Sequence, residues 1–199
     1  MGSFSRAHLS NSQEFISSLT SFYTSNPQYL SAPLLSLDIT SLFTNVPLDI
    51  VLSFLRSKIL DNDIRLPSEL NLDVLIQLIK MCCDATIFTF NNTFYAQLTG
   101  VAMGSPLACI LANLFMEFFE AELVSLFPYK PVFWKRYVDD IICVWGEDIE
   151  SFQPFLDGLN QLIPSIKLTA EWETMDHNTG IAKLPFLDVL VHRSPQGVT

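Results

Sequence analysis

The chain has 199 residues, 49% of them hydrophobic, and a formal net charge of -10 with only 11 Lys and Arg residues. This length and apolar content suffice for one domain with a substantial core, while apolar runs such as Leu107–Leu111 are far shorter than the ~18 residues that cross a bilayer. The acidic balance argues against a free-standing nucleic-acid binder, because contacts with phosphate groups need Lys and Arg.

A helix and a strand are predicted in the first 40 residues. Asn11 and, three residues later, Glu14 resemble a capping box, and apolar residues at helical spacing follow as far as Asn26-Pro27. Residues 34–38 form an apolar run that ends in Asp38. This run indicates a short buried strand with a carboxylate at its end.

Two more helices are predicted next. Pro47 suits the first turn of a helix whose apolar face continues to Ile59, and the polar residues 61–65 end it. Pro67 then opens a third helix, with an apolar stripe that reaches Cys83. We expect each helix to bury one face and expose the other.

A β-hairpin follows the third helix. Residues 86–90 and 93–98 are rich in side chains that favour strands. Asn91-Asn92 between them can adopt the positive φ values that a two-residue turn needs. The segment therefore predicts two antiparallel strands joined by a tight turn.

A loop with two glycines, residues 99–106, leads from the hairpin into another helix, and Pro106 suits its first turn. The residues of that helix expected to face inward are Leu107, Ile110, Leu111, Leu114, Phe115 and Phe118. Gly104-Ser105-Pro106 has two interpretations. It marks an ordinary helix start, or its glycine lets backbone approach a nucleotide closely while Ser105 and free N–H groups donate hydrogen bonds.

The rest of the chain alternates strands with one helix. Residues 134–145 are typical of strand, tight turn and strand, and a helix is predicted over 149–163. A half-buried strand over 166–172 and another strand over 184–191 follow. The whole order of elements predicts an α+β domain with helices packed on a mostly antiparallel sheet.

Two adjacent carboxylates, Asp139 and Asp140, lie within an apolar, β-branched and aromatic run. A structural turn is one explanation, because Asp tolerates left-handed φ values and hydrogen-bonds its own backbone. A divalent-metal site is the other, because like charges among core-forming residues are unfavourable unless a cation compensates them. Asp38 favours the metal, since three carboxylates on neighbouring strand ends can hold two Mg²⁺ ions roughly 3.5–4 Å apart.

Three motifs in order closely resemble the reverse transcriptase domain of Penelope-like retroelements. They are residues 36–47 around Asp38, residues 100–107, and residues 136–140. Two further blocks of that family match at 159–169 and 185–189. The resemblance implies a polymerase palm-like antiparallel sheet with helices packed on one face.

The resemblance also implies a role for each acidic residue. Asp38 and Asp139 would bind metal, with Asp140 as the partner acid beside them, and the cofactor would be two Mg²⁺ ions, with Mn²⁺ as a substitute. Lys167 aligns with the lysine proposed in these polymerases to protonate the leaving pyrophosphate. Its alternative is a surface lysine that alternates out of a strand.

Further residues would contact substrates. Phe43 falls where reverse transcriptases place the aromatic side chain that excludes a ribose 2′-hydroxyl by steric clash. Gly104, Ser105 and Pro106 would form the surface beneath the incoming nucleotide and the template. Tyr137 is also assigned to substrate binding by the motif that contains it.

The resemblance covers residues 15–199 as a palm with partial fingers, and residues 1–14 would be an N-terminal flank. Residues 185–191 would be the primer-grip hairpin, and we expect no thumb or GIY-YIG endonuclease in this sequence. The remainder of a longer polymerase chain would supply them. Fingers and thumb carry much of the basic track of a polymerase, which accounts for the acidic charge. Residues 1–199 alone are therefore expected to polymerise poorly.

The implied reaction is the attack of a primer 3′-hydroxyl on the α-phosphate of a dNTP, with an RNA template and a DNA primer as partners. An alternative is a catalytically inactive retroelement-derived fragment that serves as a structural or interaction module. A metal-dependent nuclease or cyclase on a similar palm is another. Without an apolar N-terminal signal core we expect an intracellular protein; the nucleus would suit a retroelement enzyme, although no targeting signal is visible.

Overall fold

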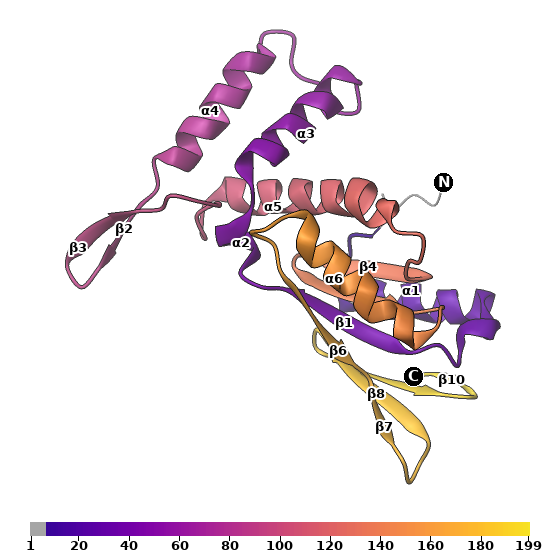
Figure 1. The fold of residues 1–199 in the computed structure, drawn as a ribbon. Helices are drawn as coiled ribbons and strands as arrows, with labels where there is room; N and C mark the ends of the chain where they lie inside the picture. Colours follow the sequence, from indigo (N-terminus) through magenta and orange to yellow (C-terminus); the bar gives the residue numbers. More distant parts are fainter. Residues whose placement is uncertain (1–6) are drawn as a thin grey trace. The chain divides into compact units, whose positions relative to one another are not determined.

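The computed structural model describes residues 7–199, which form two compact units. Unit 1 combines the described residues up to Thr40 with Glu120–Thr199, and unit 2 is Ser41–Phe119. Figure 1 shows the elements of both. None of the helices formed by residues 7–199 combines the length and apolar composition that crossing a bilayer requires.

Unit 1 is built on a four-stranded antiparallel sheet. Its strands, in spatial order, are β4 (Phe133–Tyr137), β5 (Asp140–Val144), β1 (Leu34–Ile39) and β6 (Leu168–Trp172). Leu34 pairs with Val144 and Leu37 with Ile141, while Ile39 pairs with Leu168 on the other side of β1. The strand predicted to end in Asp38 is thus confirmed as an inner strand of the sheet.

Helix α6 (Phe152–Leu162), which follows a 3₁₀ turn η5 (Ile149–Ser151), packs on one face of this sheet. The Phe152 ring meets Trp172 of β6 edge-on at 4.7 Å between centroids, and it meets Trp145, just after β5, at 5.3 Å. These aromatic contacts bury the apolar side of α6, as the sequence periodicity predicts.

The opposite face is covered by α1 (Ser12–Ser25) and a second antiparallel sheet. The order of that sheet is β10 (Gly197–Val198), β9 (Val189–Ser194), β8 (Ile181–Phe186) and β7 (Thr174–Asp176). Phe15 and Leu19 of α1 share one buried cluster with Ile142 of β5 and Phe186 of β8. The α+β prediction is therefore confirmed, and this second layer was not part of it.

The segment before α1 also packs into unit 1. The Leu9 N–H donates to the Arg136 carbonyl at 2.7 Å, and the Arg136 N–H donates to the Ala7 carbonyl at 2.8 Å. Leu9 is fully buried. These contacts bring residues 7–9, part of the predicted 1–14 flank, into the packing of the domain; residues 1–6 lie outside the described part of the chain.

Unit 2 contains four helices and one hairpin. They are α2 (Leu42–Asn45), α3 (Leu48–Leu60), α4 (Leu72–Asp84), β2 (Ile87–Phe90), β3 (Thr93–Ala96) and α5 (Pro106–Phe118). Phe54 of α3 meets Phe118 of α5 edge-on at 5.4 Å, and Lys58 forms a 2.6 Å ion pair with Glu117. Helices α3 and α5 are therefore joined by both apolar and ionic contacts.

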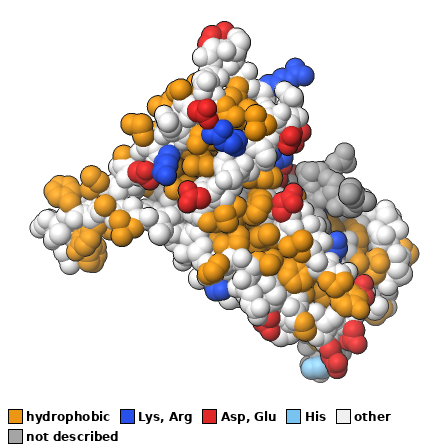
Figure 2. All heavy atoms as spheres, turned by 45° about the horizontal axis from the view of Figure 1, so that its top comes forward, with side chains coloured by type: hydrophobic (Ala, Val, Ile, Leu, Met, Phe, Trp, Pro, Cys, Tyr) orange, Lys and Arg blue, Asp and Glu red, His pale blue; other side chains and the backbone are white. Residues whose placement is uncertain are grey.

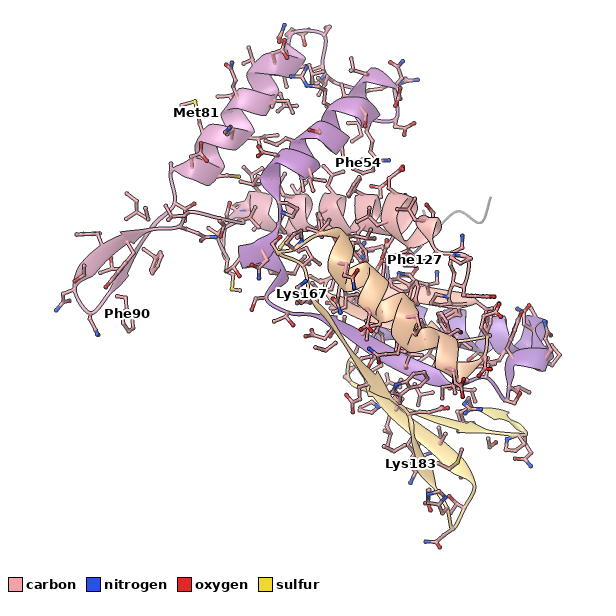
Figure 3. All side chains as sticks on the ribbon, in the orientation of Figure 1. Phe54, Met81, Phe90, Phe127, Lys167 and Lys183 are labelled. Carbon is pink, nitrogen blue, oxygen red and sulfur yellow. The ribbon has the colours of Figure 1, made fainter. Side chains whose placement is uncertain are left out.

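The β2–β3 hairpin carries exposed aromatic side chains. Its turn residues Asn91 and Asn92 have φ values of 48° and 58°, so the predicted two-residue turn is confirmed. Phe90 and Phe94 are 63% and 78% exposed. Hydrophobic atoms gather on this hairpin at the left of Figure 2, and Phe90 is labelled there in Figure 3.

Three details differ from the sequence predictions. Helix α4 begins at Leu72 rather than at Pro67, because the Asn71 side chain accepts hydrogen bonds from the N–H groups of Asp73 and Val74 and caps it there. Ile110 is 62% exposed, since α5 buries its Leu111 side. The residue pattern predicted one strand over 184–191, but the structure forms the β8–β9 hairpin there, in agreement with the hairpin that the family resemblance implied for 185–191.

Candidate active site

The three predicted carboxylates gather at one end of the main sheet of unit 1. Asp38 lies near the end of β1, Asp139 in the turn after β4, and Asp140 at the start of β5. Leu37 pairs with Ile141, so the same antiparallel register continued by one residue sets Asp38 opposite Asp140. Side chains so placed share a face of the sheet, with Cβ atoms roughly 5 Å apart.

The turn that carries Asp139 has an unusual backbone. It joins Tyr137 and Asp140, which pair across β4 and β5, and its first central residue, Val138, has a φ of 57°. Left-handed φ costs a residue with a Cβ atom about 1–2 kcal/mol, and a β-branched side chain is especially rare there. Contacts elsewhere must therefore hold this turn in place.

Electrostatics link the three acids. The pKa of Asp140 is raised from its ordinary value of 3.8, first by partial desolvation, then by the negative charge of Asp139 and that of Asp38. Each of these effects disfavours the ionised carboxylate. A cation at this end of the sheet would reverse two of them.

The donor set fits a hard divalent cation, because carboxylate oxygens are the ligands that Mg²⁺ prefers. The mutual repulsion of Asp38, Asp139 and Asp140 points the same way. Within residues 7–199, however, no three Asp, Glu, His or Cys side chains converge as a ready metal-binding group. Like charges favour separated rotamers, so joint coordination by these acids requires side-chain rotation.

Lys167 lies beside the same strand end but is turned toward α6. Its backbone carbonyl accepts a hydrogen bond from the Thr40 N–H at 2.9 Å, next to Asp38, whereas its ammonium group donates to the Asn160 carbonyl. The Asn160 side chain in turn bonds the N–H of Leu168 at 2.7 Å and its carbonyl at 3.1 Å. Figure 3 shows Lys167 in the segment between α6 and β6. Its proton-donor role stays a prediction.

Phe43 belongs to unit 2, where it lies against the first glycine of the predicted loop. The Phe43 carbonyl accepts a 2.7 Å hydrogen bond from the Val101 N–H. Gly100 has a φ of 72°, and a Cβ atom there would lie 2.4 Å from the carbonyl oxygens of both Phe43 and Thr44. Only glycine fits at this approach, so Gly100 fixes the position of the Phe43 backbone.

The predicted nucleotide-binding segment also lies in unit 2. Gly104 is exposed with a φ of 91°, and Ser105 caps α5 by accepting a 3.3 Å hydrogen bond from the Leu107 N–H. Pro106 is the first residue of that helix. The helix-start interpretation is thus confirmed, and contact with a nucleotide stays a prediction.

A comparison with known families identifies the family of the chain that carries these carboxylates. The profile of the family described as reverse transcriptase (RNA-dependent DNA polymerase) matches residues 6–176. The chain belongs to the reverse transcriptase family. No curated protein matches it.

Solved polymerases share the fold of this reverse transcriptase chain. Telomerase from Candida albicans, in complex with a TWJ fragment of telomeric RNA, is 13% identical with a TM-score of 0.68. The match covers 97% of this chain and 35% of the telomerase chain. Apo telomerase from Candida tropicalis is 10% identical with a TM-score of 0.72, and the match covers 97% of this chain and 36% of that telomerase chain. The Sicinivirus 3Dpol RNA-dependent RNA polymerase is 20% identical with a TM-score of 0.50, and the match covers 76% of this chain and 31% of the viral polymerase. The chain has a polymerase palm-like fold and spans about a third of the length of these proteins.

Sequence reasoning missed the buried polar residues of this reverse transcriptase chain. Arg136 and Glu120 form an ion pair whose side chains are 3% and 4% exposed, and the indole N–H of Trp134 donates to Glu120 at 3.1 Å. The available signal was a charged residue in each of two apolar runs. That signal does not say which charges pair.

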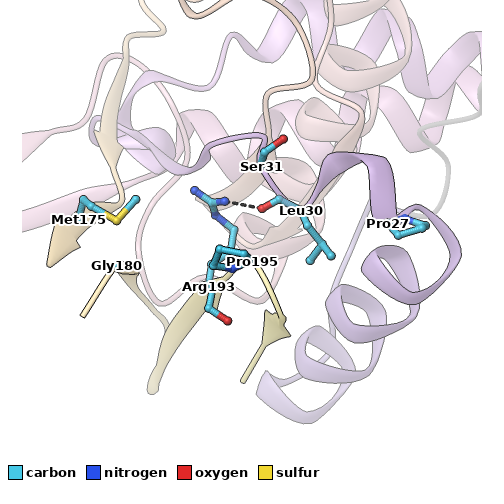
Figure 4. Close-up of a pocket in the computed structure, with 8 residues that line it drawn as sticks. Pro27, Leu30, Ser31, Met175, Gly180, Arg193 and Pro195 are labelled. Carbon is cyan, nitrogen blue, oxygen red and sulfur yellow. Dashed lines mark hydrogen bonds between the residues drawn. The ribbon is translucent and has the colours of Figure 1, made fainter. Parts of the chain in front are cut away.

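A pocket of about 440 Å³ lies elsewhere in unit 1. Its lining residues are Pro27, Leu30, Ser31, Met175, Gly180, Arg193, Ser194 and Pro195 (Figure 4). Arg193 is already paired, with Glu173 and with the Leu30 carbonyl. The pocket contains none of the predicted site residues of the reverse transcriptase chain.

Proposed function

We propose that the protein is an RNA-directed DNA polymerase that transfers nucleotides from dNTPs to the 3′-hydroxyl of a DNA primer paired with an RNA template. The observation that carries this proposal is the sheet register that sets Asp38 opposite Asp140, next to the Asp139 turn, in a chain of the reverse transcriptase family. Three acids at one end of the sheet match the requirements of two-metal nucleotidyl transfer.

Each acid has a place in this chemistry. Asp38, Asp139 and Asp140 would hold two Mg²⁺ ions, which when bound lower the pKa of the attacking hydroxyl and neutralise the charge of the leaving pyrophosphate. Pairing of β1 with β5 fixes the backbone positions of Asp38 and Asp140 before substrate arrives, so that side-chain rotation is enough to bring their carboxylates to the metal. Base choice comes from pairing with the template.

Other residues would act on the nucleotide. The Lys167 ammonium would leave the Asn160 carbonyl and donate a proton to the pyrophosphate. The Phe43 ring would exclude a 2′-hydroxyl, and Gly104-Ser105-Pro106 would lie beneath the base pair. The motif residues around Asp38, Gly104 and Asp139 support a Penelope-like retroelement as the source.

The test begins with metal binding by the purified chain. Thermal unfolding is measured during Mg²⁺ and Mn²⁺ titration of the wild type and of Asp139→Asn, followed by dTTP incorporation on oligo(dT)-primed poly(rA). We expect the metals to raise the melting temperature of the wild type only, and any incorporation to disappear in Asp139→Asn. An equal response of both proteins to metal would refute the proposed site.

The alternative is a catalytically inactive retroelement-derived fragment that serves as a structural or interaction module. An interaction module would retain its fold and its partner in Asp139→Asn, because a scaffold does not need that carboxylate. Metal stabilisation of the wild type that Asp139→Asn abolishes would contradict this alternative.

A further inference from the structure

The Asp139 turn rests on a buried ion pair. The Arg136 Nε donates to Glu120 Oε1 at 2.7 Å, and its Nη2 lies 3.4 Å from Oε2 of the same carboxylate. Both side chains are almost fully buried. Such a pair fixes the plane of a guanidinium group, because two parallel hydrogen bonds leave it little freedom to rotate.

The remaining arm of that guanidinium reaches the turn itself. Its Nη1 donates a 2.9 Å hydrogen bond to the Val138 carbonyl. Val138 is the residue with left-handed φ, and its carbonyl belongs to the peptide bond that leads into Asp139. The Arg136 guanidinium, held by Glu120, therefore determines the orientation of the peptide bond between Val138 and Asp139.

The surroundings hold Arg136 and Glu120 from several sides. The Arg136 backbone is bonded on both its N–H and its carbonyl by residues 7–9. Glu120 lies in a π-helical turn, η3 (Phe119–Leu123), and accepts a third hydrogen bond from Trp134. The turn Tyr137–Asp140 contains no glycine, so its left-handed residue depends on contacts rather than on intrinsic preference.

We infer that Arg136 is a positioning residue: held by Glu120, it fixes the Val138 peptide and so sets the direction of Asp139 and Asp140 for metal binding. The inference rests on the proposed function for its consequence, and on geometry alone for its structural part. Arg136 touches neither substrate nor metal in this role. It acts through the backbone of the turn.

The chain supplies a matched control. Arg193 and Glu173 form the second buried Arg–Glu pair of unit 1, with side chains 10% and 8% exposed. Arg193 also donates its third arm to a backbone carbonyl, that of Leu30. The two networks share their chemistry and their burial, but only the Arg136 network touches the Asp139 turn.

The experiment compares Arg136→Met/Glu120→Gln with Arg193→Met/Glu173→Gln. Each double variant removes both buried charges together, which avoids leaving one charge unpaired, and the amide oxygen introduced by Glu120→Gln still accepts from the Trp134 indole. Hydrogen–deuterium exchange of peptides that cover residues 134–145 reports the turn. Electron paramagnetic resonance of free Mn²⁺ reports metal affinity. Circular dichroism checks that each variant is folded.

We expect the first variant to lose exchange protection in the turn and to bind Mn²⁺ about tenfold more weakly, as found when partners of metal ligands are removed. The Arg193 variant should match the wild type in both measurements. Wild-type protection of the turn in the Arg136 variant, or equal loss in both variants, would overturn the inference.

Two further outcomes are decided in advance. If the first double variant does not fold, Arg136→Lys replaces it, since one ammonium group cannot bond both Glu120 and the Val138 carbonyl. The same losses of exchange protection and of Mn²⁺ affinity are expected. If Arg136→Lys also fails to fold, the positioning role is rejected. If the wild type does not bind Mn²⁺, the proposed function fails, and exchange in the turn still decides whether Arg136 fixes it.

Discussion

Asp38 on β1 lies opposite Asp140 on β5, one residue beyond the last backbone pair of the two strands. The pKa of Asp140 is raised by partial desolvation, by Asp139 and by Asp38. A carboxyl group with a raised pKa in the folded state binds its proton more tightly there than in the unfolded chain. Its contribution therefore lowers the stability as pH rises from 3.8 through the folded-state pKa, and the loss is complete above that pKa.

Replacing Asp140 by Asn should for this reason raise the melting temperature at pH 7 in EDTA. The gain should shrink as pH falls, and it should vanish below 3.8, where the wild-type carboxyl becomes protonated in both the folded and the unfolded state. Thermal unfolding followed by circular dichroism across this pH range measures it. Asp188→Asn is the control of opposite sign, because the Ser12 hydroxyl donates to Asp188 and lowers its pKa. A lower melting temperature for Asp140→Asn at pH 7 would contradict the prediction.

Gly100→Ala should destabilise unit 2 by at least about 2 kcal/mol. The new Cβ atom would lie 2.4 Å from the carbonyl oxygens of Phe43 and Thr44, and backbone at these positions cannot move aside as a flexible side chain does. Urea unfolding of both proteins gives the difference in free energy. Displacement of the Phe43 backbone by the new Cβ atom should also weaken the Val101–Phe43 hydrogen bond, and faster amide exchange at Val101 would show it.

Gly104→Ala is the matched control for that variant. Its φ of 91° is also unfavourable for alanine, but a Cβ atom there meets nothing within 4 Å. The expected cost is about 1 kcal/mol, from backbone strain alone. Equal costs at Gly100 and Gly104 would show that the close approach to Phe43 has no energetic importance.

The features that the sequence predicted correctly depend on neighbours in the chain. Asn11 caps α1 by accepting a 2.9 Å hydrogen bond from the Glu14 N–H, and Asn91-Asn92 forms the hairpin turn. Each is decided within a few residues. The end of β1 near Asp38 was equally visible, since an apolar run ended in a carboxylate.

The features that the sequence did not predict depend on contacts between distant elements. Leu187 has a φ of 54° in the β8–β9 turn, although leucine gives no local sign of a turn, so the residue pattern predicted one strand over 184–191 and only the family resemblance implied a hairpin. The pairing of Arg136 with Glu120 joins residues 16 positions apart. Rotamers of the three acids are likewise beyond a residue pattern, because they depend on charge and on bound ions.

Asn160→Ala should lower the free energy of unfolding by about 1–3 kcal/mol, because it leaves both the N–H and the carbonyl of Leu168 without their side-chain partners. Asn160→Asp should cost less, since its carboxylate still accepts from the Leu168 N–H. Lys167→Ala, at an exposed side chain, should change stability by less than about 0.5 kcal/mol. Urea denaturation of the three variants compares their free energies of unfolding. A larger loss of stability for Lys167→Ala than for Asn160→Ala would contradict the prediction that Asn160 is the residue that stabilises this segment.

Tyr23→Phe should stabilise the protein by about 1 kcal/mol. The Tyr23 side chain is 5% exposed, and its hydroxyl has no hydrogen-bond partner among residues 7–199. The same burial raises the pKa of this hydroxyl well above its usual range. Phenylalanine keeps the ring contact with Phe22, at 5.2 Å between centroids, and removes only the desolvated hydroxyl. Tyr129→Phe is the control, because Tyr129 is 53% exposed and the removal of its hydroxyl should change stability little. Urea unfolding should separate the two variants; a loss of stability in Tyr23→Phe would show that the hydroxyl is hydrogen-bonded to water in the folded protein.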